Sequence, residues 1–569
     1  MTLKINLFNY MLYNQFGGKR NDKPKWEIFK HNGVLFPEPY KPHGIPILYD
    51  GKKIVLDPES EEYATIYAKF TETDYVKNKK FNKNFFNDWR KFLIKGGYNE
   101  IKDLNKIDFK LILNFILKNK EKQQNLSKED KEKIKNKKDS FEEKYKYAYV
   151  DNKKEPVGNF RIEPPGIFLG RGCHPKAGKI KPRIYPEDIT INIDKDSDIP
   201  ELPYFYRDHK WGKIIHDNTL EWIASWKDII TGKIKYIWMG AKSEFKAKSD
   251  QEKFDLARKL KKSIMNIRKN NLYNITSIDV DQKTKQLATA LYLIDKLALR
   301  VGNEKSKEEA DTVGVCSLRV EHIKLEEDNK ISLDFLGKDS IRYQNTVKID
   351  EEVYKSLSKL IYNKKPYEQL FNLISPNMLN NYLKEMMNDL TAKVFRTYNA
   401  SNLFQIELDN ISNEIEKDNE DNNINLILNK YQKANVKVAL LCNHQKNVSK
   451  TFNEQLNKLN DKVKDFKNIK KELENNKKEL DNKKDKSKIQ KINEKIKKMN
   501  EKIHDTKAKK DLKLELKNLS LTTSKINYID PRITIAFFKK HNLPLDKIFS
   551  ASLIDKFFWA MDINKDWNF

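Results

Sequence analysis

Cysteine is scarce in this chain. Only three of its 569 residues are cysteines, and they lie far apart, without any paired spacing: Cys173, Cys316 and Cys442. A zinc module requires closely spaced Cys or His ligands, and a disulfide framework requires several cysteines at short spacings. The sequence therefore excludes both classes and is typical of a protein from a reducing compartment.

Long hydrophobic runs are missing as well. Nowhere do about eighteen apolar residues follow one another, which is roughly what a membrane-spanning helix needs. In the opening stretch, MTLKINLFNYMLYNQF, polar residues such as Lys4, Asn6 and Asn9 interrupt the apolar positions, unlike the apolar core of a signal peptide. We expect a soluble, intracellular protein.

A nucleotide-binding loop is also absent, although EPPGIFLGRGCHPKAGKIKPR (163–183) contains glycines, a Gly-Lys pair and many cations. A Walker loop places four residues between its first Gly and Gly-Lys-Ser/Thr. Here five residues lie between Gly172 and Gly178, and Ile180 replaces the hydroxyl that would bind magnesium. The flanking prolines also disfavour a strand-loop-helix turn. ATP binding is therefore a weak interpretation, and what the cations of this stretch bind must be inferred from the rest of the chain.

Positive charge is in large excess. The chain has 110 Lys and Arg against 82 Asp and Glu, a formal net charge of +28. A polyanion is the simplest counter-surface, since each neutralised phosphate releases counterions. A general bias of composition towards Lys and Asn could produce part of the excess. Charge alone therefore favours a nucleic-acid partner without establishing one.

Composition divides the chain into a mixed and a mainly helical part. After a short segment (1–23), residues 24–240 are rich in Pro, Gly and aromatics, with strand-like runs at 189–193 and 234–238. A helix is predicted around Phe85 to Ile94, and an exposed helix or hinge at 118–138. From 241 to 447, apolar residues recur at three and four, as in KQLATALYLIDKLALRVGN, which predicts helices. We predict that this helix is capped at Gly302.

Two further patterns complete the predicted architecture. KISLDFLGKDSIRY alternates, breaks at Gly337-Lys338 and resumes, which predicts a β-hairpin or a bent strand with a lysine at its tip. Within 448–518, two heptad-like apolar seams flank the polar DNKKDKSK, which predicts an antiparallel coiled-coil hairpin. Residues 519–569 predict a small C-terminal helical domain. The fold class is α+β and multidomain, with a mixed α/β lobe before the mainly helical lobe.

Five blocks of the sequence, in this order, resemble the catalytic blocks of eukaryotic type IB DNA topoisomerases: LALRVGNEK, DFLGKDSIRY, LTAKVFRTYNAS, ALLCNHQ and TSKINYIDPRIT. The cationic stretch at 163–183, together with PEDITIN and IIHDN, resembles parts of that family's DNA clamp. The resemblance implies a monomeric isomerase that cuts one strand of duplex DNA, relaxes positive and negative supercoils and rejoins the strand. It implies that the enzyme requires neither ATP nor an essential metal.

The resemblance also assigns catalytic roles. Tyr528 would attack a phosphodiester and hold the cut strand as a 3′-phosphotyrosine. Arg300 and Arg396 would bind the non-bridging oxygens through forked hydrogen bonds, for which a guanidinium is suited. His444 would donate to the same oxygens, and Lys338 would protonate the departing 5′ oxygen.

Further positions match DNA contacts of the family: Arg171, His174, Lys176, Lys235, Tyr236, Asn303, Thr312, Asp339, Lys393 and Asn527. Arg171 would enter the minor groove, and Arg171, Asp339 and Asn527 match the neighbourhood where camptothecin-type inhibitors bind. Two positions depart from the family pattern: Leu169, where Arg is common, and Cys173, where Asn is common. About twenty residues precede the resemblance in place of the family's long tail with import signals, and the nucleus is the expected location.

Each assigned residue, taken alone, has a structural alternative. Arg300 could meet a helix dipole, and Arg396 could form a surface ion pair. Lys338 could be solvated, while His444 and Tyr528 could be ordinary core residues. Only their order and contexts together favour catalysis.

Two other functions stay open at this point. A tyrosine recombinase shares the Arg/Lys/Arg/His/Tyr set, but it needs a specific site and several protomers, and the hairpin between His444 and Tyr528 disfavours it. A non-catalytic, architectural DNA-binding protein would gain little from keeping Tyr528.

Overall fold

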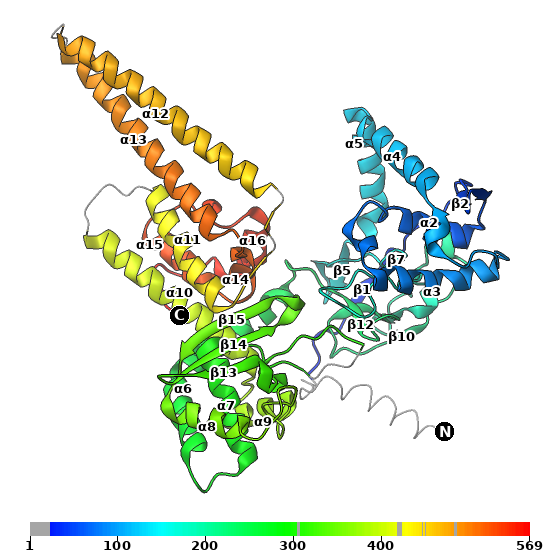
Figure 1. Ribbon diagram of the computed structural model, residues 1–569, viewed down its shortest axis with the longest axis horizontal. Helices are drawn as coiled ribbons and strands as arrows, with labels where there is room; N and C mark the ends of the chain where they lie inside the picture. The colour runs from blue at the N-terminus through cyan, green and yellow to red at the C-terminus, as the bar shows by residue number, and fades with distance from the viewer. Residues whose placement is uncertain (1–22, 304–307, 418–423, 447, 450, 483–485) are drawn as a thin grey trace. The chain divides into compact units, whose positions relative to one another are not determined.

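The computed structural model describes residues 23–303, 308–417, 424–446, 448–449, 451–482 and 486–569. The chain separates into two compact units (Figure 1). The first comprises Met1–Ser249 with Lys305–Thr312, and the second comprises Asp250–Glu304 with Val313–Phe569. No helix in the described part of the chain combines the length and the hydropathy that a membrane crossing requires.

The first unit combines small sheets with short helices. The strands pair in the orders β1-β5-β6, β3-β2-β4, β10-β9-β11-β12 and β7-β8, and the β9–β10 pair is parallel. The elements are β1 (Phe29–His31), β2 (Ile47–Tyr49), β3 (Lys52–Ile54), α2 (Pro58–Ala68), α3 (Lys79–Lys95), β4 (Ile107–Asp108), α4 (Lys110–Gln124), α5 (Lys128–Glu142), β5 (Tyr147–Val150), β6 (Lys153–Pro156), β7 (Gly166–Ile167), β8 (Ile180–Lys181), β9 (Thr190–Asn192), β10 (Lys213–Ile215), β11 (Trp222–Lys227) and β12 (Ile234–Trp238).

Helix α3 illustrates how the sequence builds this unit. Phe81, Phe85, Trp89 and Leu93 recur at every fourth residue, so they lie on one face of the helix, and all four are buried. The helix begins after Asn78, whose side chain accepts a hydrogen bond from the backbone N–H of the second helical residue at 2.9 Å. The predicted helix is confirmed, and the predicted exposed stretch at 118–138 is divided between α4 and α5.

The second unit is mainly helical and has one three-stranded sheet of order β13-β14-β15. Its elements are α6 (Glu244–Thr276, beginning just before the unit), α7 (Gln282–Leu297), β13 (Ile323–Glu326), β14 (Lys330–Leu336), β15 (Arg342–Lys348), α8 (Glu351–Ile361), α9 (Pro376–Met386), α10 (Ala392–Lys417), α11 (Ile424–Leu441), α12 (Phe452–Asn482), α13 (Lys486–Glu515), α14 (Leu521–Asn527), α15 (Pro531–Lys540) and α16 (Ala551–Lys556).

One hydrophobic cluster holds the second unit together. It joins Leu291 of α7 and Phe404 of α10 to Phe538 and Phe549 of the C-terminal segment, and all four side chains are buried. The C-terminal helices therefore share a core with the helices that precede the coiled coil. The proposed domain boundaries at 240, 447 and 518 stay predictions.

The predicted end of α7 is wrong. The helix ends at Leu297, and Ala298 takes the left-handed conformation with φ of 48°, so Gly302 is not its cap. Three- and four-residue spacing cannot distinguish the last apolar residues of a helix from apolar residues in the segment that follows.

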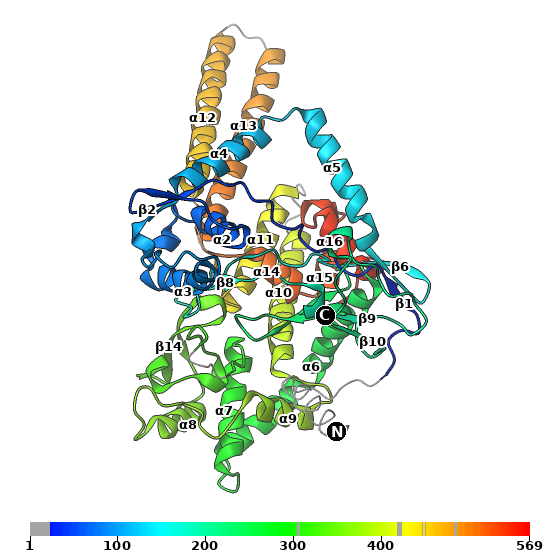
Figure 2. The same cartoon turned by 90° about the vertical axis from the view of Figure 1, so that its right-hand side faces the viewer.

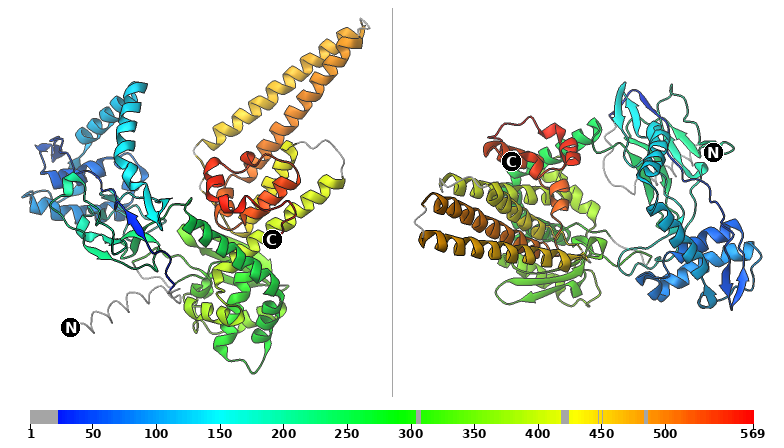
Figure 3. Two further views of the ribbon diagram at one scale, coloured as in Figure 1. Left: turned by 180° about the vertical axis from the view of Figure 1, so that it is seen from behind. Right: turned by 90° about the horizontal axis from the view of Figure 1, so that it is seen from above.

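Helices α12 and α13 form the predicted coiled-coil hairpin and run side by side in every view (Figures 2 and 3). Seam residues such as Leu459, Phe466, Ile496 and Ile503 are only partly buried, as expected when two helices cover each other along one narrow stripe. The β-hairpin, the coiled coil and the small C-terminal helices are all present, so the predicted α+β fold class is confirmed.

A candidate catalytic pocket in the second unit

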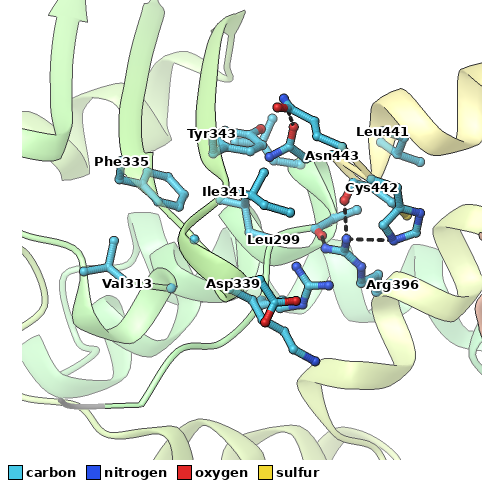
Figure 4. Close-up of a pocket in the computed structure, with 18 of the residues that line it drawn as sticks. Leu299, Val313, Phe335, Asp339, Ile341, Tyr343, Arg396, Leu441, Cys442 and Asn443 are labelled. Atoms are coloured by element: carbon cyan, nitrogen blue, oxygen red, sulfur yellow. Dashed lines mark hydrogen bonds between the residues drawn. The ribbon is translucent and has the colours of Figure 1, made fainter. Parts of the chain in front are cut away.

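A pocket of about 140 Å³ opens where several segments of the second unit meet (Figure 4). The segment after α7, the β14–β15 turn, α10, the residues after α11 and α14 all contribute to its wall. Its polar lining includes Arg300, Lys338, Asp339, Arg396, Asn443, His444, Gln445 and Thr523. Four of the five residues that the resemblance marks as catalytic therefore meet at one pocket.

Lys338 reaches the pocket from the tip of a β-hairpin, as predicted. Strands β14 and β15 pair antiparallel up to Leu336 and Arg342. The chain then reverses through a hydrogen bond from Gly337 N–H to the carbonyl of Ile341, at 2.8 Å. Asp339 adopts a left-handed φ of 67°, a conformation that Asp tolerates better than most residues. This tight turn leaves the Lys338 side chain exposed at the mouth of the pocket.

The segment that carries Arg300 is held by a close backbone crossing. The carbonyl of Arg300 accepts a hydrogen bond from Val315 N–H at 2.9 Å. Gly302 has a φ of 75°, and a Cβ atom there would lie 2.4 Å from Cα of Gly314. Only glycine permits this approach, so both glycines are needed to bring Arg300 to the pocket.

The guanidinium of Arg396 is almost completely buried, since only 5% of the residue is exposed. It donates to the carbonyls of Ala298, at 2.6 Å, and of Cys442 (Figure 4). Its Nε–H is also buried and has no acceptor among the described residues. Burial, together with the charge of Arg300, lowers the pKa of Arg396. An unused donor on a buried cation is suited to bind an anion.

The imidazole of His444 lies between Arg396 and a serine. Its Nε2 is 3.3 Å from Nη2 of Arg396, and its Nδ1 is 2.6 Å from Oγ of Ser524 on α14. Burial is the main cause that lowers the pKa of His444 to about 3, and the charges of Arg396 and Arg300 add to it. The imidazole is therefore neutral at physiological pH.

In a His444→Gln variant, the free energy of unfolding is expected to fall less on acidification than in the unchanged protein. An unfolded chain takes up a proton on this histidine below about pH 6.5, whereas the folded chain does not until about pH 3. The stability that the neutral His444 contributes is therefore complete above the pKa of the unfolded chain. It is lost as the pH falls towards the pKa of the folded chain. Between about pH 6.5 and pH 5 it amounts to at most about 2 kcal/mol.

Calorimetry of the second unit's unfolding at about pH 7.5 and about pH 5 measures this dependence. The His444→Gln variant should lose less stability between the two values than the unchanged protein. His504→Gln, at an exposed position of α13, is the matched control and should keep the full dependence. Equal losses in all three proteins would contradict the burial of a neutral imidazole at His444.

Tyr528 directly follows α14, and its backbone is tied to α10. Oγ of Ser401 donates to the carbonyl of Tyr528 at 2.9 Å and accepts from Asp530 N–H at 3.0 Å. The tyrosine ring stacks on His444, with centroids 5.2 Å apart and an interplanar angle of 27°. The guanidinium carbon of Arg396 lies 5.0 Å from the centroid of the same ring. The fifth assigned residue therefore lies directly against two of the other four.

Some of the predicted DNA contacts lie in the first unit: Arg171, His174, Lys176, Lys235, Tyr236 and Thr312. Arg171 is exposed in the loop between β7 and β8, with Cys173. In the same loop His174 accepts a hydrogen bond from Lys176 N–H at 3.1 Å, and Leu169 packs against the cluster around α3. Thr312 is partly buried.

Acidic partners hold both lysines of this set, which the sequence did not indicate. Lys176 pairs with Glu308 at 2.6 Å, and Lys235 pairs with Asp228 at 2.6 Å and also with Glu163. Burial opposes the charge of Lys235, but hydrogen bonds to Asp228 and Glu163 raise its pKa.

Tyr236 lies on β12, the strand that also carries Lys235. Its ring contacts the rings of Trp222 and Trp238, with centroid distances of 5.5 and 5.3 Å.

The other predicted contacts lie in the second unit: Asn303, Asp339, Lys393 and Asn527. Asp339 lines the pocket, and Asn303, Lys393 and Asn527 have exposed side chains. Asn527 ends α14 and donates to the carbonyl of Thr523 at 3.1 Å. The inhibitor neighbourhood stays a prediction, since Arg171 belongs to the other unit. Across the described ranges, no group of three or more His, Cys, Asp or Glu could hold a metal ion.

Three family models match successive parts of the chain: the DNA binding fragment of eukaryotic DNA topoisomerase I (24–239), its catalytic core (242–478) and the C-terminal topoisomerase domain (500–569). DNA topoisomerase 1 of Homo sapiens is 41% identical over 562 residues, which cover 96% of this chain and 72% of the human protein. The chain belongs to the eukaryotic DNA topoisomerase I family. The resemblance of the five sequence blocks is thereby confirmed.

Other relatives in the topoisomerase I family match over the same share of the chain. DNA topoisomerase 1 alpha of Arabidopsis thaliana is 46% identical over 557 residues, which cover 96% of this chain and 59% of that protein. DNA topoisomerase 1 of Candidozyma auris is 38% identical over 637 residues, with 96% and 83% covered. The chain thus spans 59% of the length of the Arabidopsis topoisomerase I.

Proposed function

We propose that this protein is an ATP-independent type IB DNA topoisomerase. It cuts one strand of duplex DNA, lets the broken end swivel about the intact strand, and rejoins it, so that supercoils of either sign relax. One observation carries the proposal above the others. Tyr528, buried Arg396 and neutral His444 pack against one another beside a pocket that Arg300 and Lys338 also line.

The cleavage step follows from the chemistry of these side chains. Oη of Tyr528 attacks a DNA phosphorus and forms a phosphotyrosine ester with the 3′ phosphate, while the bond from phosphorus to the 5′ oxygen breaks. The phenol proton passes to solvent, and Lys338 supplies a proton to the departing 5′ oxygen. Rejoining is the same step in reverse.

The cations of the pocket stabilise the charge that develops on the phosphate. Arg396 has a buried Nε–H without an acceptor among the described residues, and Arg300 lines the same pocket. Two guanidinium groups can contact the non-bridging oxygens through forked hydrogen bonds, which a lysine cannot form. Such preorganised donors commonly contribute about 10²–10³ each in rate.

We propose that the reaction requires neither ATP nor an essential metal. The phosphotyrosine ester keeps the free energy of the phosphodiester, so rejoining needs no further energy source. The arginines supply the positive charge that a metal ion supplies in other phosphoryl-transfer sites.

The partner in this proposal is duplex DNA, bound by a monomer in the nucleus. The net charge of +28 supports a polyanionic partner, as does the exposed position of Arg171 in the β7–β8 loop. Camptothecin-type inhibitors are proposed to bind near Arg171, Asp339 and Asn527 when DNA is present.

A relaxation assay tests the proposed function. Supercoiled plasmid without any particular recognition site should relax fully with catalytic amounts of the protein, in EDTA and without ATP. Relaxation of both positively and negatively supercoiled plasmid is expected. Failure on both plasmids would contradict the proposal, and relaxation only of a plasmid with a defined site would favour a tyrosine recombinase. DNA binding without any relaxation would favour an architectural protein.

A further inference from the structure

Ser524 contacts His444 and Tyr528 of the candidate site but has no assigned role itself. It lies on α14, one helical turn before Tyr528, and none of its surface is exposed. Its Oγ lies 2.6 Å from Nδ1 of His444, while its carbonyl accepts the backbone N–H of Tyr528 at 2.9 Å. The helix turn that carries the tyrosine therefore also carries the hydrogen-bond partner of the histidine.

The neighbours of His444 determine which ring nitrogen carries the proton. A guanidinium can only donate, so the contact of Nε2 with Nη2 of Arg396 requires a lone pair on Nε2. The proton of the neutral ring is then on Nδ1 and is donated to Oγ of Ser524. In this state His444 has no proton to offer to an anion in the pocket.

Binding of a phosphate reverses these requirements. Arg396 turns its donor from Nε2 to a phosphate oxygen, and His444 can contact the same phosphate only if Nε2 carries the proton. The doubly protonated ring is disfavoured, because the imidazole is buried beside Arg396 and Arg300. The neutral ring must therefore move its proton from Nδ1 to Nε2, which leaves Nδ1 in need of a donor.

We propose that Ser524 is a positioning residue for the cleavage reaction under the proposed function: its hydroxyl orients His444 and, by changing from acceptor to donor, lets the neutral ring present Nε2–H to the DNA phosphate. A hydroxyl can accept or donate by rotating its hydrogen, whereas a carboxylate could only accept. Nδ1 releases one proton to solvent and Nε2 takes one up, so the net protonation of the ring is unchanged.

Single-turnover cleavage tests this role. The substrates are 5′-labelled duplexes whose scissile strand ends a few nucleotides beyond a cut mapped with the unchanged protein, so that the cut end leaves. Ser524→Ala should cleave about tenfold or more slowly, because a buried ring nitrogen loses its only fixed partner. Its affinity for the same DNA should stay within about twofold, since Ser524 does not line the pocket.

A double-mutant cycle distinguishes positioning from a general structural effect. In a His444→Ala background, Ser524→Ala should cause no further loss of cleavage, because the residue through which it acts is already gone. Ser524→Cys keeps the volume of the side chain but only a weak hydrogen bond, and it serves as the measured variant if Ser524→Ala does not fold. It should show the same dependence on His444.

Ser412→Ala is the matched control. Ser412 is also buried and its Oγ lies 2.8 Å from Nε2 of His541, but this pair lies outside the pocket. Cleavage by Ser412→Ala should equal that of the unchanged protein. Cleavage at the unchanged rate by the Ser524 variants, or an equal loss in the His444→Ala background, would overturn the proposal. Absence of cleavage by the unchanged protein would instead overturn the proposed function.

Discussion

Tyr528→Phe is expected to abolish covalent capture of the protein on cleaved DNA. The substitution removes only the phenol oxygen, so the ring can keep its stacking on His444 and its contact with Arg396. DNA binding should therefore persist while the nucleophile is gone. Loss of an enzyme's nucleophile costs on the order of 10⁴–10⁶ in rate, which places the variant below detection in a capture assay.

The measurement is gel retention of a 5′-labelled strand with denatured protein, together with plasmid relaxation. The matched control is Tyr362→Phe, since Tyr362 follows α8 in the same unit and is 76% exposed. It should form the adduct and relax plasmid at the unchanged rate. An adduct formed by Tyr528→Phe at that rate would show that another residue is the nucleophile.

Arg396→Ala is expected to have the second largest effect. The change removes a buried cation next to the phenol ring and leaves the carbonyls of Ala298 and Cys442 without their donor. Cleavage should fall by about 10²–10³ or more. The free energy of unfolding should also fall, by about 1–3 kcal/mol for each carbonyl left unsatisfied.

Arg396→Lys separates charge from geometry. A lysine restores a positive charge, but its donors all lie on one nitrogen and cannot reproduce the planar fork of the guanidinium, so it should recover only part of the cleavage rate. Arg268→Ala is the control for loss of an arginine. Arg268 forms a hydrogen bond of 2.7 Å to Asp295, and neither residue lines the pocket. Cleavage by Arg396→Ala at the rate of this control would contradict a role of Arg396 at the phosphate.

The sequence predicts the parts of this molecule in which one local pattern dominates. The four-residue spacing from Phe81 to Leu93 predicts α3, and the alternation around Gly337 predicts the β-hairpin that carries Lys338. The apolar seams predict the paired helices α12 and α13. In each of these cases, neighbouring residues alone determine which side is buried.

The candidate site depends instead on contacts between distant segments. The five assigned residues are recognisable through family blocks, but nothing local shows that Arg396 is buried or that His444 lies between an arginine and a serine. Ser401 and Ser524 carry no sequence signal of their own, because serines are common and usually solvated. Gly302 is of a residue type that often caps helices, yet in the structure it lets the backbone pass close to Gly314.

Helix α10 carries Arg396 and, through Ser401, also holds the backbone of Tyr528. Arg396 and the backbone of Tyr528, the two groups proposed to bind and attack the phosphate, are therefore both held by one helix. A tilt of α10 as a whole moves both together and leaves their separation nearly constant. Heating should accordingly leave the intrinsic cleavage chemistry intact until the helix itself detaches, so inactivation and cooperative unfolding of the second unit are expected to coincide.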